Sequence, residues 1–129
     1  MNGHSAASAY KASIIENAPP IKVVHLMYEG ALRQVATARS LDPVEQFSEY
    51  NDSLNRAGAI VAELRLALDP EHAPELTAQL DSLYHFVERQ IREAFLEKNK
   101  EPLDSAESVL RTLLDGWRQV DVAMEDGAA

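Results

Sequence analysis

The histidines of this chain are its best candidates for chemistry, and two of them lie four positions from a carboxylate. Glu29 follows His25, and His85 follows Asp81, so on a helix each pair would share one face. A di-iron bundle needs Glu-x-x-His spacing, and no glutamate here has a histidine three residues later. We therefore predict no metal site and no cofactor, and we interpret both pairs as polar residues at the edge of a core.

Histidine phosphotransfer is the other chemistry that a helical bundle could perform. A reactive phosphotransfer histidine is exposed to its donor. Glu29 lies four residues after His25, and Glu88 lies three residues after His85. A carboxylate beside the histidine would repel an incoming phosphoryl group. A phosphotransfer-type signalling bundle therefore stays only as the alternative from another functional class.

Other catalytic constellations are missing from the sequence. There are no cysteines, which excludes thiolate nucleophiles, thiolate metal sites and disulfides. The chain has neither a phosphate-binding glycine loop nor a Gly-x-Ser-x-Gly turn. The carboxylates are expected to pair with arginines at helical spacing, as Glu29 with Arg33 and Glu88 with Arg92. We expect a protein that is not an enzyme and binds no small-molecule substrate.

Four stretches with apolar residues at helical spacing must position any functional surface. Prolines at Pro20, Pro43 and Pro102 mark helix starts, because proline fits the first helical turn. The predicted helices span residues 20–39, 43–68, 75–98 and 102–124. Their short connections force neighbouring helices to run antiparallel. The predicted fold is all-α, an antiparallel four-helix bundle over residues 19–124, with a flexible N-terminal arm or cap (1–18) and a frayed tail (125–129).

Each predicted helix has one apolar stripe for the core of the bundle. The expected core residues are Ile21, Val24, Tyr28, Ala31, Leu32, Val35, Ala38, Phe47, Leu54, Ala57, Val61, Leu64, Leu68, Leu76, Leu80, Leu83, Tyr84, Val87, Ile91, Ala94, Phe95, Leu103, Ala106, Leu110, Leu113, Trp117, Val120 and Met124. Two helices also contain an interior glycine, Gly30 and Gly58. Since glycine costs about 1 kcal/mol in a helix relative to alanine, we predict that a neighbouring backbone approaches closely there.

The helices also carry more apolar residues than one face can hold. On the second predicted helix, Ala59, Ala62 and Leu66 cluster on the back, with Ile60 on a flank. Two alanines one turn apart, followed by a leucine, form a shallow groove in which another helix could lie. The other residues predicted to bind a partner are Leu26, Phe86, Leu96 and Val109. The same surplus would also allow a weak homodimer.

The N-terminal residues are small and polar apart from a few large apolar groups. Tyr10 and Ile15 could dock on the predicted groove and cover it while no partner is bound. This segment lacks the basic and apolar regions of a secretory signal. No run in the chain approaches the ~18 apolar residues of a membrane span. We expect a cytoplasmic protein.

The acidic balance of the chain excludes several partners. The formal net charge is −9 at pH 7, and the basic residues are scattered. Nucleic acids and anionic lipid surfaces recruit clustered lysine and arginine. We therefore expect neither nucleic acid nor a membrane surface as a partner.

Short motifs follow one another through all four predicted helices. They are Tyr10 ahead of Pro20, Met27-Tyr28-Glu29-Gly30-Ala31, Asn55-Arg56-Ala57, Leu83-Tyr84, Glu93-Ala94, and Leu113-Leu114 shortly before Trp117. In this order and spacing they resemble the flagellar secretion chaperone family, FliS. The resemblance covers nearly the whole chain.

The resemblance implies a function that agrees with the spare apolar surface. FliS-like chaperones hold the C-terminal helical segment of flagellin in apolar grooves along the bundle. They prevent premature polymerisation and deliver the subunit to the flagellar type III export gate. The implied partners are therefore flagellin and an export gate protein. An adaptor for another secreted helical protein stays open as a second alternative.

Overall fold

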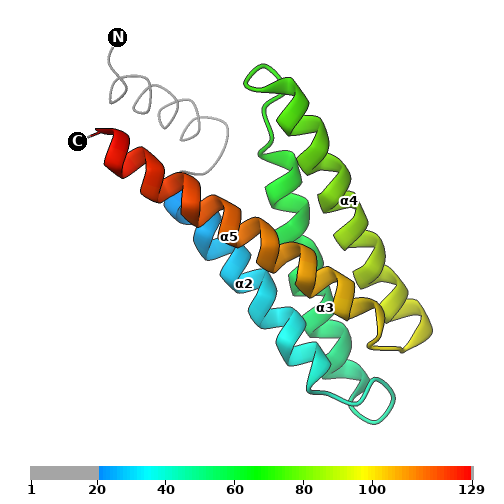
Figure 1. Ribbon diagram of the computed structural model, residues 1–129. Coiled ribbons are helices and arrows are strands. Elements are labelled where there is room, and N and C mark those ends of the chain that lie inside the picture. Colours follow the sequence, from blue (N-terminus) through cyan, green and yellow to red (C-terminus); the bar gives the residue numbers. More distant parts are fainter. Residues whose placement is uncertain (1–20, 129) are drawn as a thin grey trace.

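The computed structural model describes the backbone of residues 21–128 and the side chains of residues 21–119, and this part of the chain is all-α. Its helices are α2 (Ile21–Arg39), α3 (Phe47–Leu66), α4 (Pro74–Glu97) and α5 (Pro102–Ala128). They form a four-helix bundle (Figure 1), which confirms the predicted fold class.

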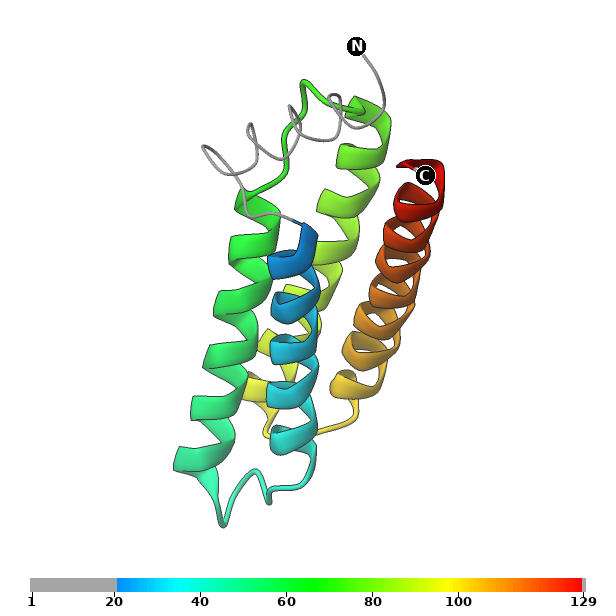
Figure 2. The ribbon, with the colours of Figure 1, turned by 90° about the vertical axis from the view of Figure 1, so that its left-hand side faces the viewer.

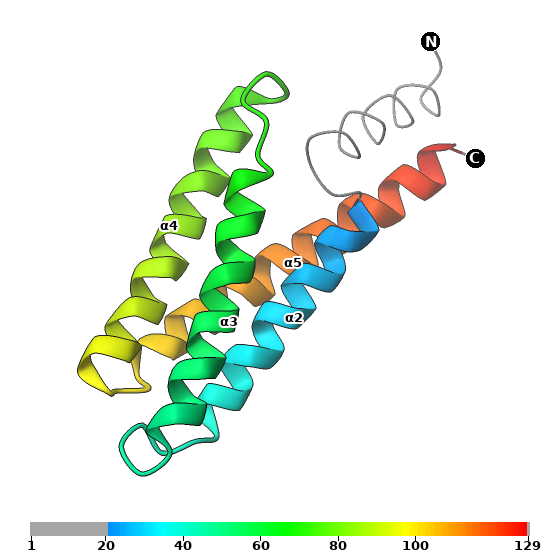
Figure 3. The ribbon, with the colours of Figure 1, turned by 180° about the vertical axis from the view of Figure 1, so that it is seen from behind.

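The four helices enclose one core as a ring of antiparallel neighbours. α2 packs against α3 and α5, and α4 packs against the same two helices. Two views show α2 beside α5 and α3 beside α4, with the two pairs crossing (Figures 1 and 3). The loops before α3 and before α5 lie at one end of the bundle, and the loop between α3 and α4 lies at the other (Figure 2).

The turn before α3 moves the start of that helix away from its predicted position. Asp42 Oδ1 accepts hydrogen bonds from the backbone N–H groups of Val44 (2.8 Å) and Glu45 (2.9 Å). These bonds lower the pKa of Asp42. Asp42 thus caps a separate turn, and α3 begins only at Phe47. The prediction that the second helix starts at residue 43 is wrong by four residues.

The other boundaries lie close to those predicted, except at the C-terminal end. α4 ends where Lys98 adopts a left-handed conformation (φ 51°) and its N–H bonds to the Ala94 carbonyl. Ala73, just before Pro74, is left-handed as well (φ 50°). α5 continues to Ala128, past the predicted end at Met124.

Most of the predicted core residues with described side chains are buried, with exceptions at the ends and edges of helices. The predicted core residues Val120 and Met124 lie outside the described side chains. The buried apolar residues are Tyr28, Ala31, Val35, Ala38, Tyr50, Leu54, Ala57, Val61, Leu64, Leu80, Tyr84, Val87, Ile91, Ala94, Leu103, Ala106, Leu110 and Leu114. The predicted core residues Phe47, Leu76, Leu83 and Phe95 are instead between 36% and 51% exposed. Phe47 is the first residue of α3 and Leu76 lies in the first turn of α4, where fewer neighbours cover them.

Three aromatic side chains join three helices in the middle of the core. The hydroxyls of Tyr28 (α2) and Tyr84 (α4) lie 2.5 Å apart, and Trp117 Nε1 of α5 donates to the Tyr28 hydroxyl at 3.2 Å. Both tyrosines are at most 1% exposed, and burial raises the pKa of each. We call these three residues the aromatic cluster. It connects α2 with α4 across the bundle.

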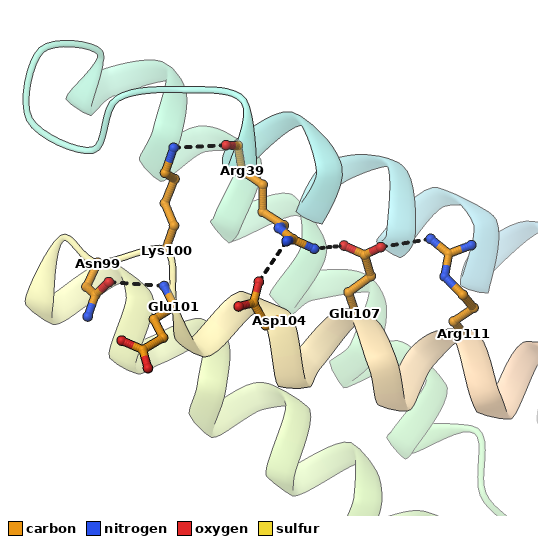
Figure 4. Close-up of polar contacts among 7 residues, drawn as sticks. All are labelled: Arg39, Asn99, Lys100, Glu101, Asp104, Glu107 and Arg111. Carbon is orange, nitrogen blue, oxygen red and sulfur yellow. Dashed lines mark hydrogen bonds and ion pairs between the residues drawn. The ribbon is translucent and has the colours of Figure 1, made fainter.

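A polar network ties the end of α2 to the start of α5 (Figure 4). Arg39 forms ion pairs with Asp104 (2.7 Å) and with Glu107, and Arg111 bonds to Glu107 at 2.8 Å. The hydrogen bond from Arg111, followed by that from Arg39, lowers the pKa of Glu107. Lys100 Nζ donates to the Arg39 carbonyl at 3.0 Å. The cations at the C-terminus of α2 and the anions at the N-terminus of α5 both complement the helix dipoles.

The interior glycines meet side chains and not a neighbouring backbone. A Cβ at Gly30 would lie 3.4 Å from Ile60 Cδ1, and one at Gly58 would lie 4.0 Å from Ile91 Cγ2. Both are ordinary van der Waals distances. The prediction of close backbone approach is therefore wrong at both positions.

Candidate partner-binding surface

A groove of about 700 Å³ runs along the outside of the bundle between α3 and α4. Its lining residues are Leu54, Asn55, Gly58, Ala59, Arg65, Glu88, Ile91, Arg92, Phe95 and Leu96. We call this feature the α3–α4 groove. It brings together Ala59 and Leu96, two of the residues predicted to bind a partner.

Small residues on α3 keep the floor of the groove low. Gly58 and Ala59 are adjacent on α3, and a methyl group added at Gly58 would only reach contact distance of Ile91. On α4, Phe95 is 37% and Leu96 67% exposed. A leucine this exposed contributes little to its own domain, so its apolar surface stays available to another molecule.

Charged side chains occupy one end of the groove and pair across it. Arg65 Nε of α3 lies 3.4 Å from Glu88 Oε2 of α4, and Arg65 Nη1 lies 3.1 Å from Nε2 of His85. Glu88 therefore pairs with Arg65 of the neighbouring helix and not with Arg92 four residues along its own. Within the part of the chain that the structure describes, Arg92 has no hydrogen bond or ion pair.

The second pairing predicted at helical spacing is also replaced by one between helices. Glu29 Oε1 of α2 accepts a hydrogen bond from Arg118 Nη2 of α5 at 3.0 Å. Helical spacing does govern other surface pairs, such as Asp52 with Arg56 at 3.2 Å. The two wrong predictions share a cause: a carboxylate at a helix–helix boundary reaches the neighbouring helix.

The remaining predicted residues of α3 lie around the groove without lining it. Leu66 is 80% exposed and directly follows Arg65 in the chain. Ala62 is half-buried. Ile60 packs over Gly30 between α3 and α2, so it faces away from the groove.

The other predicted residues are scattered over the bundle. Phe86 and Val109 are partly buried and pack against the core. Leu26 is 62% exposed on α2. Tyr10 and Ile15 lie outside the described residues. Of the predicted partner-binding residues that the structure describes, only Ala59 and Leu96 therefore line the α3–α4 groove.

The two histidines singled out for chemistry have different surroundings. His85 belongs to the charged cluster at the end of the groove. Its Nε2 lies 3.8 Å from Asp81 Oδ2, and its Nδ1 lies 3.9 Å from Glu88 Oε2. His25 lies half-buried on α2, and its Nε2 has no hydrogen-bond partner among the described residues. Over the same residues, no three metal-ligating side chains gather into a site.

Several residues that line the groove were not recognised from the sequence as part of a binding surface. Asn55, Gly58, Arg65 and Arg92 were not predicted as partner-binding residues, and Phe95 was assigned to the core. Helical spacing identifies which residues leave the core face, but not which neighbouring helix stands beside them.

No helix in the described part of the chain combines the length and the apolar character that a membrane span requires.

Comparison with known proteins agrees with this fold and these motifs. The model of the family described as Flagellar protein FliS matches residues 3–124. The chain belongs to the FliS family. Its relatives include flagellar secretion chaperone FliSB of Pseudomonas aeruginosa, 31% identical over 80% of this chain and 82% of the relative. The FliS of Campylobacter jejuni is 30% identical over 93% of this chain and 94% of its own length.

The family membership extends to more distant relatives. The flagellar secretion chaperone FliS of Salmonella typhimurium is 23% identical over 84% of this chain and 81% of the relative. The resemblance drawn from motifs in the sequence is thereby confirmed. These matches identify the chain as a member of a family of flagellar secretion chaperones.

Proposed function

We propose that this protein is a non-enzymatic chaperone for flagellin in the cytoplasm. It binds the C-terminal helical segment of flagellin through apolar side chains exposed along the bundle. The bound segment is withheld from other flagellin subunits, so filament assembly does not start before export. The chaperone then delivers the subunit to the flagellar type III export gate.

The α3–α4 groove is the observation that carries this proposal. Its floor of Gly58 and Ala59 is shallow enough for a helix to pack closely, and Phe95 and Leu96 offer apolar contacts at its side. Leu66 and Leu26 extend the exposed apolar surface beyond the groove. Surface of this kind is what an amphipathic segment requires.

The N-terminal arm completes the proposal. Tyr10 and Ile15 would cover apolar surface until flagellin arrives, and the arm would be free to contact the export gate once displaced. Another secreted helical protein as cargo is the alternative that uses the same surface. Phosphotransfer has less support, because His85 lies among charged partners that include Glu88.

A binding measurement with the C-terminal segment of the cognate flagellin tests the proposal. Leu96→Asp places a charge on the exposed wall of the groove, and we expect it to weaken binding at least about tenfold. Leu76→Asp is the matched control, because Leu76 is 51% exposed on the same helix but does not line the groove. Circular dichroism should be unchanged in both variants.

Two results would reject the proposal in different ways. No binding of the flagellin segment at micromolar concentration would remove flagellin as the cargo. Equal binding by the Leu96→Asp and Leu76→Asp variants would remove the groove as the binding site. Phe86 is unsuitable for this test, because it packs against the core and an aspartate there would disturb the fold.

A further inference from the structure

The charges lining the α3–α4 groove run against the balance of the whole protein. The chain carries a net charge of −9. The lining contains Arg65 and Arg92 but only Glu88 as an acid, a net charge of 2 − 1 = +1. Because Arg65 is paired with Glu88, the excess positive charge resides on Arg92.

Arg92 is also the lining cation that has no hydrogen bond or ion pair with any other residue that the structure describes. Glu88, one turn earlier on α4, is the nearest acid at helical spacing, yet it pairs with Arg65 of α3. Across the groove, Asn55 of α3 lines the same cavity, and no hydrogen bond of its side chain exists within the described residues. A guanidinium and an amide facing one groove form a set of donors suited to a carboxylate.

We propose that Arg92, assisted by Asn55, determines which segment the groove accepts by pairing with an acidic side chain of the cargo. The inference rests on the proposed chaperone function and adds a rule of selection to it. The cargo segment is helical, places small or apolar residues on Gly58, Ala59 and Leu96, and carries an aspartate or glutamate that meets Arg92.

A second copy of the chain is a poor occupant of the groove on the same grounds. Two copies would each bring a net charge of −9, and their mutual repulsion opposes close association. A cargo segment that presents one carboxylate carries far less charge than a second copy, so the overall repulsion is weaker and the nearby cation of Arg92 counts for more. Charge thus favours a foreign segment over self-association.

The test compares two arginines that differ in their position on α4. Arg92→Gln removes the charge from the groove, whereas Arg89→Gln removes an equal charge from an exposed residue outside its lining. Affinity for the flagellin C-terminal segment is measured by calorimetry at low and at high ionic strength. Arg92→Gln should weaken binding about five- to tenfold at low salt and remove most of its salt dependence. Arg89→Gln should stay within about twofold of the unchanged protein.

Changes in the segment identify the carboxylate that Arg92 meets. Each aspartate or glutamate of the segment is replaced in turn by its amide. One replacement should cause the same loss as Arg92→Gln and should add no further loss when the two are combined. A segment with an amidated C-terminus should bind as before, because the proposed partner is a side chain. If amidation alone reproduces the loss, the side-chain assignment is overturned.

The remaining outcomes distinguish a failure of the role of Arg92 from a failure of the proposed chaperone function. Equal losses for Arg92→Gln and Arg89→Gln, with the Leu96→Asp effect intact, overturn the role of Arg92 and leave the chaperone function standing. Failure of the unchanged protein to bind the segment overturns both. If Arg92→Gln alters sedimentation of the protein alone and leaves segment binding unchanged, the groove is a self-association surface and the proposal is wrong.

Discussion

The aromatic cluster and the α3–α4 groove use the same helix in opposite ways. On one face of α4, Tyr84 is 1% exposed and bonded to Tyr28 of α2. On another, Leu96 is 67% exposed and Arg92 has no polar partner among the described residues. The cluster has its two tyrosines buried and their hydroxyls bonded, whereas the groove leaves Leu96 and Arg92 available to another molecule. The difference separates the part of α4 that holds the bundle together from the part that is free to bind.

The largest expected effect is on stability and comes from emptying the aromatic cluster. Tyr84→Ala would leave a cavity in the core and remove one of the two hydrogen-bond partners of the Tyr28 hydroxyl. We expect the free energy of unfolding to fall by about 3–5 kcal/mol, as for other buried aromatic residues. Urea unfolding followed by circular dichroism measures the loss.

The neighbouring residue supplies the control for this comparison. Leu83 precedes Tyr84 but is 36% exposed, so Leu83→Ala should cost only about 1 kcal/mol. The contrast between cluster and surface would be wrong if the two variants lost similar stability. It would be sharpened if Leu96→Asp, in the groove, unfolded at the same urea concentration as the unchanged protein.

Alkaline pH should weaken the bundle through the same cluster. Burial raises the pKa of Tyr28 and of Tyr84 above the value of 10.0 for a free tyrosine. As the pH rises above about 10, the unfolded chain therefore loses these protons first, and the free energy of unfolding falls. The expected slope is about 1.4 kcal/mol per pH unit for each buried tyrosine. Below pH about 9 the tyrosines should cause no dependence on pH.

A tyrosine-to-phenylalanine variant isolates the contribution of the cluster to this slope. Tyr84→Phe keeps the ring but removes one titrating group, so its stability should fall less steeply with pH than that of the unchanged protein. Titration of lysines and of Tyr50 is common to both proteins and cancels in the difference. Identical slopes would mean that the cluster tyrosines ionise as readily in the folded as in the unfolded state.

Helical spacing was sufficient to predict the bundle and most of its interior. Tyr28, Tyr84 and Val87 fall on one face of their helices at intervals of three or four residues, and each is buried. Spacing failed where burial depends on the neighbouring helix. Leu114 is absent from the expected core and yet is only 3% exposed.

The groove was predicted only in part for the same reason. Ala59 and Leu96 left the core faces of their own helices, so the sequence identified them. The position of α3 relative to α4 decides that Arg92 and Asn55 share one cavity with them, whereas Ile60 turns toward Gly30 on α2. That relative position results from packing of the whole bundle and does not follow from the pattern of a single helix.

The smallest expected effect compares two glycines, one in the groove and one outside it. A Cβ at Gly58 would lie 4.0 Å from Ile91 Cγ2, and nothing lies within 4 Å of a Cβ at Gly116. Alanine should therefore raise the free energy of unfolding by about 0.5–1 kcal/mol at either position, through helix propensity and a less flexible unfolded chain. The added methyl group at Gly58 stands on the floor of the groove, so Gly58→Ala should also weaken binding of the flagellin segment about threefold. Gly116→Ala should leave that affinity unchanged, and equal affinities for the two variants would mean that the segment does not pack against this floor.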